Sequence, residues 1–427
     1  MSRDPIEVFL NSLHHPMLAS IDLKLDRMLR LLAILGNPQK RIPPVIHVAG
    51  TNGKGSLLAN LQSILQMAGY KVHKYTSPHL VHFRERIVLA GRDIEEAHIL
   101  NIVKHVSSQL QSQPATFFEA TTAIAFLAFS EKPADVLLLE TGMGGRLDAT
   151  NVVEKPILTA ITPIAVDHRE YLGKTIAAIA GEKAGIIKSG VPCVIGRQEA
   201  EAAAVLEEKA KIVSASLYRS GHEWHHTHGE YKSDKRYIHF KPSLNGLFQY
   251  DNSATAIACL DMLPQFKVTD KQIIEGIAGV HWPARLQHIT SGALVTLANG
   301  HQLWLDGGHN PQGGQVLGAW MAEQQHDIHV ICGMMKGKDA KAYLQHIAPY
   351  LQSLHAVAIP NESSSHSSSS LASEAKTLGI DAYESASVEK ALQTITSHAK
   401  NPSIICICGS LYLAGHVLHI NASQKAA

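Results

Sequence analysis

Short apolar runs alternate with helical patterns from residue 45 to about residue 195. The runs typical of buried strands are VIHVA (45–49), DVLLLE (135–140), ILTAITPIAV (157–166) and PCVIG (192–196). Apolar residues recur at helical spacing after Gly55, and residues 118–129 and 174–185 are also typical of helices. Strands that alternate with helices in this way predict a parallel sheet with crossover helices.

The pattern changes after residue 211 and starts again after residue 285. Residues 212–241 are polar and aromatic, which indicates a hairpin or a surface insertion, and a helical stretch follows over 249–279. The segment HWPARLQ (281–287) is typical of a boundary, and four further apolar runs beyond it end in turn residues. The run SSSHSSSS (363–370) indicates a flexible loop.

We therefore predict an α/β protein of two domains, over residues 1–285 and 286–427. A chain of 427 residues also favours more than one core. The first domain is expected to be a P-loop-type ATPase with a parallel sheet. The second is expected to be a smaller, Rossmann-like α/β domain.

Composition excludes some classes of protein. Lys and Arg (38) nearly balance Asp and Glu (37), so the net charge of +1 argues against nucleic-acid binding through a basic surface. No run approaches the ~18 apolar residues needed to cross a bilayer, and the N-terminus does not resemble a secretory signal. The five cysteines show no CxxC spacing. These features favour a reduced, cytoplasmic protein that has neither membrane nor nucleic acid as a partner.

The stretch HVAGTNGKGS (47–56) joins a predicted strand to a predicted helix. Backbone N–H groups of such a turn, helped by the helix dipole, bind phosphate, and Lys54 would lie beside the β- and γ-phosphates. The stretch departs from the P-loop template because Gly55 occupies the hydroxyl position and Ser56 comes one place later. A tight Gly-rich turn is the alternative. With the hydroxyl displaced, other residues would have to hold a metal.

Two residues at predicted strand ends are candidate metal ligands. Glu140 ends DVLLLE, so its carboxylate would emerge at the carboxyl edge of the sheet and suit a hard cation. His168 follows ILTAITPIAV in the same way. An ordinary strand-end carboxylate and a structural histidine are the alternatives. HEWHHTH (222–228) lacks the spacing of a metal site, and we predict a solvated loop there.

Eight motifs occur in a fixed order, and together they resemble the folylpolyglutamate synthase and dihydrofolate synthase family, relatives of the Mur ligases. They are AGTNGKGS (49–56), TSPHLVHFRERI (76–87), FFEATT (117–122), ETGMGGRLDATN (140–151), ITPIAVDH (161–168), EKAGIIK (182–188), WPARL (282–286) and DGGHNP (306–311). The resemblance spans almost the whole chain. It implies ATP-dependent amide ligation, in which a substrate carboxylate attacks the γ-phosphate and the amine of glutamate then displaces phosphate from the acyl phosphate.

The resemblance also implies roles for individual residues. The ATP-binding residues would be Thr51, Asn52, Gly53, Lys54, Gly55, Ser56, Asn252, Arg285, Asp306 and His309. A pair of Mg²⁺ ions would be held by Ser77, Glu140 and His168. The catalytic residues would be Lys54, His168 and Lys183. Lys183 matches a lysine that is carbamylated in this family, which would turn a cation into an anion. ATP is expected between the domains.

The pterin substrate would be bound by Asp22 and Leu23 in SIDLKLDRM (20–28), and by Phe118, Glu119, Arg146, Leu147 and Asp148. Lys24 stands where the family usually has glycine, and Glu119 could instead be a buried helix-start carboxylate. The expected substrates are dihydropteroate, reduced folates and L-glutamate, used by a monomer of the bacterial bifunctional type. The alternatives are a folylpolyglutamate synthase alone, a Mur-type amino-acid ligase, and a P-loop switch or kinase.

Overall fold

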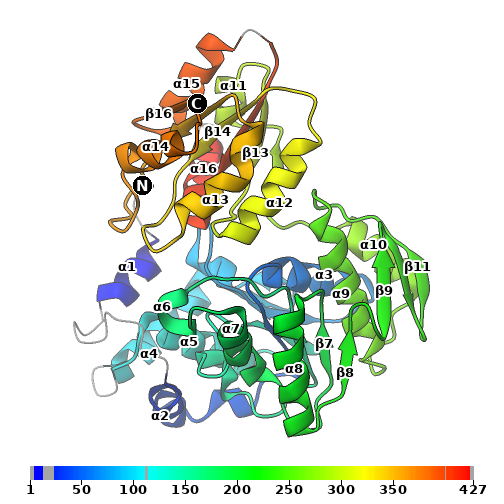
Figure 1. Ribbon diagram of the computed structural model, residues 1–427. Coiled ribbons are helices and arrows are strands. Elements are labelled where there is room, and N and C mark those ends of the chain that lie inside the picture. Colours follow the sequence, from blue (N-terminus) through cyan, green and yellow to red (C-terminus); the bar gives the residue numbers. More distant parts are fainter. Residues whose placement is uncertain (1–3, 13–23, 111–113, 400, 424–427) are drawn as a thin grey trace. The chain divides into compact units, whose positions relative to one another are not determined.

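The computed structural model describes residues 4–12, 24–110, 114–399 and 401–423 (Figure 1). The chain folds into two compact units. The larger contains the residues up to Ser243 together with Phe248–His281, and the smaller contains Leu244–Leu247 and the residues from Trp282 onward. Each unit is built around its own sheet.

The larger unit contains an eight-stranded sheet in the order β4-β3-β2-β5-β1-β6-β7-β8. Its parallel strands are β1 (Val45–Ala49), β2 (Val72–Tyr75), β5 (Val136–Glu140), β6 (Leu158–Ile161), β7 (Cys193–Ile195) and β8 (Leu217–Arg219). Two antiparallel strands, β3 (Ile87–Leu89) and β4 (Arg92–Asp93), complete one edge. The predicted parallel sheet with crossover helices is confirmed.

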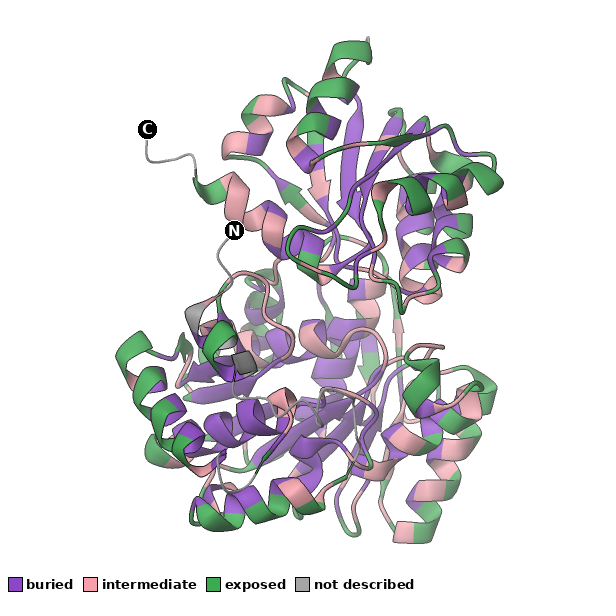
Figure 2. Cartoon of the chain, turned by 90° about the vertical axis from the view of Figure 1, so that its left-hand side faces the viewer, coloured by how far each residue is buried: buried purple, intermediate pink, exposed green. Residues whose placement is uncertain are grey.

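Helices cover both faces of this sheet, which is why its strands are apolar along their whole length. Leu137 and Leu139 of β5 pack on one face, and Val136 and Leu138 pack on the other. The first face is covered by α1 (Pro5–Ser12), α2 (Asp26–Ile34), α4 (Glu96–Leu110) and α5 (Phe117–Glu131). The second is covered by α3 (Lys54–Met67), α9 (Phe248–Asp261) and α10 (Asp270–Ala278). Figure 2 shows buried residues along the strands and exposed residues on the outer helix surfaces.

The remaining helices of the larger unit either pack near β6 and β7 or are only three or four residues long. Helices α7 (Ile176–Lys183) and α8 (Ala200–Val213) pack with Ile161 of β6 and Ile195 of β7. The short helices are the 3-10 helices η2 (Pro38–Lys40), η3 (Phe83–Arg86), η4 (Ala149–Val152) and η5 (Ala184–Ile186), and the α-helix α6 (Arg169–Leu172).

The predicted insertion over 212–241 folds as β8 followed by a three-stranded antiparallel sheet. Its strands are β9 (Trp224–Thr227), β10 (Glu230–Ser233) and β11 (Tyr237–His239). The prediction that HEWHHTH is a solvated loop is wrong for Trp224–Thr227, because these residues form β9 and Trp224 is only 1% exposed. His226 is bonded to Asp251 of α9 at 2.8 Å.

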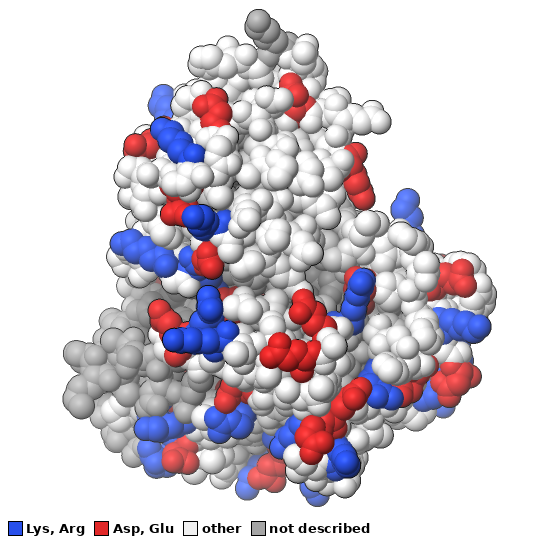
Figure 3. Space-filling model, viewed as in Figure 1, with Lys and Arg blue, Asp and Glu red and all other residues white. Residues whose placement is uncertain are grey.

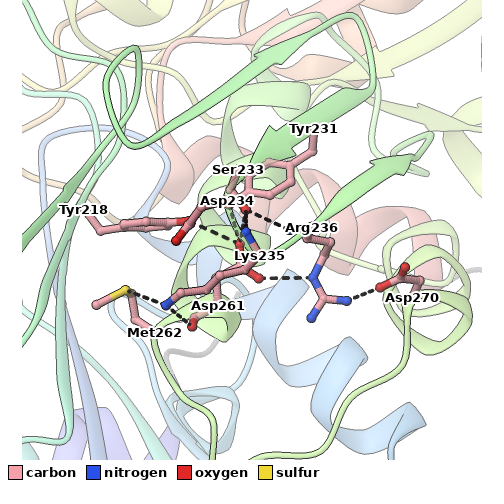
Figure 4. A network of polar contacts seen from close by, with 9 residues as sticks. All are labelled: Tyr218, Tyr231, Ser233, Asp234, Lys235, Arg236, Asp261, Met262 and Asp270. Carbon is pink, nitrogen blue, oxygen red and sulfur yellow. Dashed lines mark hydrogen bonds and ion pairs between the residues drawn. The ribbon is translucent and has the colours of Figure 1, made fainter.

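One buried carboxylate fastens this small sheet to α9. Asp261 accepts hydrogen bonds from the Tyr231 hydroxyl at 2.8 Å, from Ser233 Oγ at 2.9 Å and from Arg236 Nε at 3.1 Å (Figure 4). Arg236 also pairs with Asp270 at the start of α10. A buried charge needs such partners, so the network fixes the sheet against the helices that follow it.

The smaller unit contains a six-stranded sheet in the order β12-β13-β17-β14-β15-β16. Its strands are β12 (Gln287–Ile289), β13 (Gln302–Leu305), β14 (Ile328–Cys332), β15 (Ser353–Ala356), β16 (Ala382–Glu384) and β17 (Ile404–Cys408). β12 pairs antiparallel with β13, and the other pairs are parallel. Its helices are α11 (Ala293–Leu297), α12 (Pro311–Ala322), α13 (Ala340–Ile347), η6 (Ala348–Tyr350), α14 (Ser368–Thr377), α15 (Val388–His398) and α16 (Leu411–Ser423). The expected second α/β unit is thus confirmed.

Two local predictions are corrected. The strand expected over 157–166 ends at Ile161, since the carbonyl of Pro163 bonds to residues of the Gly-rich loop instead of to a strand. The prediction of a flexible loop over 363–370 is wrong for residues 368–370, which begin α14. Ser367 caps this helix by accepting a hydrogen bond from the Ser370 N–H at 3.1 Å. Serine is a favoured N-cap residue, and this role is hidden in a serine-rich run.

The surface carries charges of both signs. Figure 3 shows lysine and arginine interspersed with aspartate and glutamate over the face drawn there. None of the described helices combines the length and the hydrophobicity that a membrane span requires.

Candidate active site

The Gly-rich loop runs from β1 into the first turn of α3. Gly53 is the N-cap of α3 and has φ 89°, which favours glycine. A Cβ at Gly53 would lie 2.4 Å from Asn252 Oδ1, so the loop packs directly on α9. The N–H groups of Thr51 and Asn52 donate to the carbonyl of Pro163 at 3.0 and 3.3 Å. The loop is therefore held from both sides, and the first N–H groups of α3, which have no partners within the helix, are of the kind that binds anions at helix N-termini.

Glu140 lies beside the start of α3. The residue follows Leu138 by two positions along β5, so its side chain points to the α3 face of the sheet. Its Oε1 lies 3.8 Å from Lys54 Nζ, and its Oε2 accepts a hydrogen bond from the Ser77 N–H at 3.1 Å. Three motifs that are far apart in the sequence thus meet at one buried carboxylate.

Lys183 ends α7 and reaches the same loop from another side. Its Nζ donates to the carbonyl of Gly50 at 2.8 Å, and Lys54 Nζ donates to that carbonyl at 3.2 Å. Burial, together with the charge of Lys54, lowers the pKa of Lys183 to about 7, although Asp167 and Asp148 oppose the shift. At neutral pH this amine therefore spends much of its time uncharged.

His168 lies in the segment that follows β6, the strand beside β1. Thr51 Oγ1 donates to the carbonyl of Ala165 and accepts from its N–H, both at 3.0 Å, which ties this segment to the Gly-rich loop. His168 has a left-handed backbone (φ 50°, ψ 41°), and its Nε2 lies 3.9 Å from Asp167 Oδ2. Strained backbone of this kind concentrates at functional sites.

The motifs GMGGRLDAT and EKAG pack against each other through their glycines. A Cβ at Gly145 would lie 2.9 Å from the carbonyl oxygens of Glu182 and Lys183, and a Cβ at Gly185 would lie 2.3 Å from Arg146 Cα. Arg146, which is exposed, pairs with Glu182 at 2.8 Å. The loop with the predicted pterin contacts is thereby placed beside Lys183.

Three further predicted pterin residues belong to this loop or touch it. Leu147 is half-buried, while Asp148 is buried and accepts hydrogen bonds from the N–H groups of Thr150 and Met143 at 3.0 and 2.8 Å. The ring of Phe118 covers the loop so closely that a Cβ at Gly142 would lie 2.2 Å from Phe118 Cζ.

Glu119 makes the contacts of a helix-start carboxylate. It forms a capping box with Thr116, in which the Thr116 N–H donates to Glu119 Oε2 at 2.7 Å. Arg27 of α2 pairs with both carboxylate oxygens at 3.1 Å. Contact of Glu119 with substrate stays a prediction, and Asp22 and Leu23 lie outside the described residues. Sequence analysis missed Arg27, although it stands in the same SIDLKLDRM segment.

Near the start of α9 is a residue that sequence analysis also missed. Gln249 is fully buried, and its Oε1 accepts a hydrogen bond from Asn252 Nδ2 at 2.9 Å. This bond orients the amide of Asn252, whose oxygen faces Gly53. The pair stands one helical turn apart, a spacing that could have drawn attention to Gln249.

The smaller unit holds its three predicted nucleotide contacts together at the end of β13. Asp306 is buried and accepts hydrogen bonds from the N–H groups of Leu286 and Gly308 at 2.8 and 2.7 Å. Burial raises the pKa of Asp306, while these bonds and the charge of Arg285 oppose the shift. His309 Nδ1 lies 3.2 Å from the carbonyl oxygen of Gly307.

The donors near the loop fit Mg²⁺ better than a transition metal. Across the part of the chain that the structure describes, no cluster of three or more His, Cys, Asp or Glu side chains could hold a metal ion by itself. Mg²⁺ commonly takes one or two carboxylates and completes its shell with water and substrate phosphates. Glu140, a buried carboxylate next to Lys54 and the Ser77 N–H, matches that pattern, and the roles of Ser77 and His168 as further ligands stay predictions.

Comparison with known proteins shows the same two units. Residues 48–260 match the Mur ligase middle domain, and residues 294–420 match the C-terminal domain of dihydrofolate synthetase. A dihydrofolate synthase/folylpolyglutamate synthase of Bacillus subtilis (strain 168) is 34% identical over 425 residues, which cover 92% of this chain and 94% of that protein.

Solved structures agree over nearly the full length. The structure of E. coli FolC in complex with DHPP and ADP has a TM-score of 0.88 at 29% identity and covers 99% of both chains. A bifunctional folylpolyglutamate synthase/dihydrofolate synthase with Mn, AMPPNP and L-glutamate bound has a TM-score of 0.85 at 30% identity, covering 97% of this chain and 98% of that one. The chain therefore belongs to the dihydrofolate synthase/folylpolyglutamate synthase family, relatives of the Mur ligases, as its ordered motifs predicted.

Proposed function

We propose that this protein is an ATP-dependent ligase that adds L-glutamate to dihydropteroate and to reduced folates through an acyl phosphate. The observation that carries the proposal is the meeting of Lys54, Lys183 and Glu140 around Gly50, at the N-terminus of α3. Relatives that carry both activity names, and solved relatives with ADP, AMPPNP, Mn or L-glutamate bound, support it.

The chemistry explains why cations surround the loop. A substrate carboxylate attacks the γ-phosphate, so two anions must approach each other, and preorganised positive charge lowers that barrier. The phosphates would lie on the N–H groups at the start of α3, with Lys54 neutralising their charge. Glu140, Ser77 and His168 would hold Mg²⁺, which supplies further charge neutralisation. Asn252, Arg285, Asp306 and His309 would bind the rest of the nucleotide.

We further propose that Lys183 is carbamylated. Its uncharged amine attacks CO₂, a nitrogen–carbon bond forms, and one proton is released, leaving a carbamate anion. The burial of Lys183 and its pKa of about 7 favour the uncharged amine that this reaction requires. A carbamate would also replace the repulsion between Lys183 and Lys54 by attraction.

The pterin end of the substrate would lie along the loop that carries Arg146, Leu147 and Asp148. Phe118 would offer an aromatic face, because its ring already covers Gly142 of that loop. Arg146 is exposed and would offer a cation to an acidic substrate. Asp22 and Leu23 would contact the same substrate from the N-terminal segment.

Phosphate release by the purified enzyme tests the proposed function. With ATP, Mg²⁺ and glutamate present, we expect release on addition of either dihydropteroate or tetrahydrofolate, and none without glutamate. Turnover of tetrahydrofolate alone would leave a folylpolyglutamate synthase and remove the first activity. Turnover of neither pterin would overturn the proposal.

A further inference from the structure

A buried chain of hydrogen bonds lies beneath the loop that carries the predicted pterin contacts. His47 of β1 is fully buried, and its Nε2 lies 2.8 Å from Thr150 Oγ1. Thr150 Oγ1 in turn donates to Asp148 Oδ1 at 2.5 Å. The chain therefore connects the strand that leads into the Gly-rich loop with the loop over residues 141–152.

The direction of each hydrogen bond follows from its partners. A carboxylate only accepts, so the Thr150 hydroxyl must give its proton to Asp148 and accept one from His47. This places the proton of the imidazole on Nε2. Nδ1 of His47 is buried and has no hydrogen-bond partner, as suits an unprotonated nitrogen. Burial lowers the pKa of His47 to about 3, so the ring stays neutral.

The position of His47 in the sheet explains why its side chain meets Thr150. Ile46 and Val48 of β1 face α3, so His47 points to the opposite face, where η4 carries Thr150. His47 pairs in register with Leu139, and the next pair along is Val48 with Glu140. The hydrogen-bond chain thus begins on β1, just before the Gly-rich loop and one residue pair before Glu140 of the neighbouring strand β5.

At the other end of the hydrogen-bond chain, the Asp148 carboxylate holds the Met143–Thr150 segment in a turn. Besides the Thr150 hydroxyl, Asp148 accepts hydrogen bonds from the N–H groups of Thr150 and Met143. One carboxylate therefore joins both ends of the Met143–Thr150 segment, between which Arg146 and Leu147 lie. If the carboxylate rotates, the segment loses the hydrogen bonds that join its two ends.

We propose that His47 and Thr150 are positioning residues that lock the Asp148 carboxylate, and thereby set the loop for the pterin substrate. This inference rests on the proposed function, because it assumes that residues 146–148 meet the pterin. It assigns a substrate-specific role to a fully buried histidine that stands just before the Gly-rich loop.

The test compares variants that keep or remove each hydrogen bond. Thr150→Val keeps the shape of the side chain but removes the hydroxyl, whereas Thr150→Ser keeps the hydroxyl. His47→Leu removes the donor, and His47→Gln offers an amide N–H in its place. We expect Thr150→Val and His47→Leu to raise KM for the pterin about tenfold or more, with kcat and KM for ATP changed less than about twofold. Thr150→Ser should raise KM for the pterin much less than Thr150→Val does. His47→Gln should raise it somewhat less than His47→Leu does.

The double variant and a proton signal add independent readouts. Thr150→Val with His47→Leu should cost little more than either change alone, because both break one chain. A downfield imidazole N–H resonance in the wild type should survive Thr150→Ser and disappear in Thr150→Val. An equal rise in KM for ATP and for the pterin, or a Ser variant as impaired as the Val variant, would overturn the positioning role while the proposed function stands. Failure of the wild type to use either pterin would overturn both.

Discussion

Lys183 and Lys54 donate to the same backbone carbonyl, that of Gly50. Two ammonium groups this close repel each other, and burial together with the charge of Lys54 lowers the pKa of Lys183 to about 7. Deprotonation alone would relieve the repulsion, but it would also remove a charge from the site. The proposed carbamylation would relieve the repulsion and add an anion near the proposed metal ligands.

At this residue we predict loss and chemical rescue of activity. Lys183→Ala should lower kcat by about a hundredfold or more, because it removes a charged group that preorganises the site. A small carboxylic acid, such as formate or acetate, should partly restore the rate by supplying the missing carboxylate. Lys211→Ala is the control, since Lys211 is exposed on α8 and should leave the rate unchanged. Absence of rescue at every acid concentration would count against the carbamate.

The pH dependence follows from the same pKa. CO₂ reacts with the uncharged amine, and a pKa of about 7 makes its fraction about a tenth at pH 6, about half at pH 7 and about nine tenths at pH 8. At fixed dissolved CO₂, the wild-type rate should therefore rise from pH 6 to pH 8. The rate of Lys183→Ala with added acid should lack this rise, so the two pH profiles measured side by side separate the lysine from other groups.

At the scale of elements, the site depends on the contact between the loop 141–152 and the end of α7. Gly145 meets the carbonyls of Glu182 and Lys183 with no room for a Cβ. Gly145→Ala should therefore lower the free energy of unfolding by about 1–3 kcal/mol and reduce activity, because it pushes the loop away from Lys183.

A matched glycine in α7 provides the control for this prediction. A Cβ at Gly181 would meet nothing within 4 Å, and the residue is helical. Gly181→Ala should raise the free energy of unfolding by about 0.5–1 kcal/mol without loss of activity, since alanine favours a helix. Chemical unfolding and steady-state rates of both variants check the pair. Equal effects of the two changes would show that the close contact at Gly145 is unimportant.

Sequence patterns predicted those strands and helices that are determined by the residues within the segment itself. The continuous apolar runs at 45–49 and 135–140 predicted strands buried on both faces, and β1 and β5 are such strands. The polar run HEWHHTH concealed β9, because a single buried tryptophan determines which face of that strand packs. Pairs such as Arg27 with Glu119, and His47 with Thr150, could not be inferred from the sequence. Their contacts depend on which strands and helices become neighbours in three dimensions.

At the scale of the whole molecule, the chain carries the GTNGKGS motif once. The two proposed reactions share the same chemistry, a carboxylate that attacks ATP and an amine that displaces phosphate. They differ in the acid that is activated, which is the pteroate in one reaction and the glutamate end of a reduced folate in the other. A single GTNGKGS loop and a single GMGGRLDAT loop therefore predict one active site for both reactions.

One site for two substrates predicts mutual competition. Dihydropteroate should inhibit the ligation of tetrahydrofolate competitively, with an inhibition constant equal to its own KM within about twofold, and the reverse should also hold. In mixtures, total phosphate release should stay below the sum of the two separate rates, since each substrate excludes the other. Lys211→Ala serves as a control that should leave both constants unchanged, because Lys211 is exposed on α8. Additive rates in mixtures, or noncompetitive inhibition, would require a second pterin site and would contradict the assignment of both reactions to one site near Gly50.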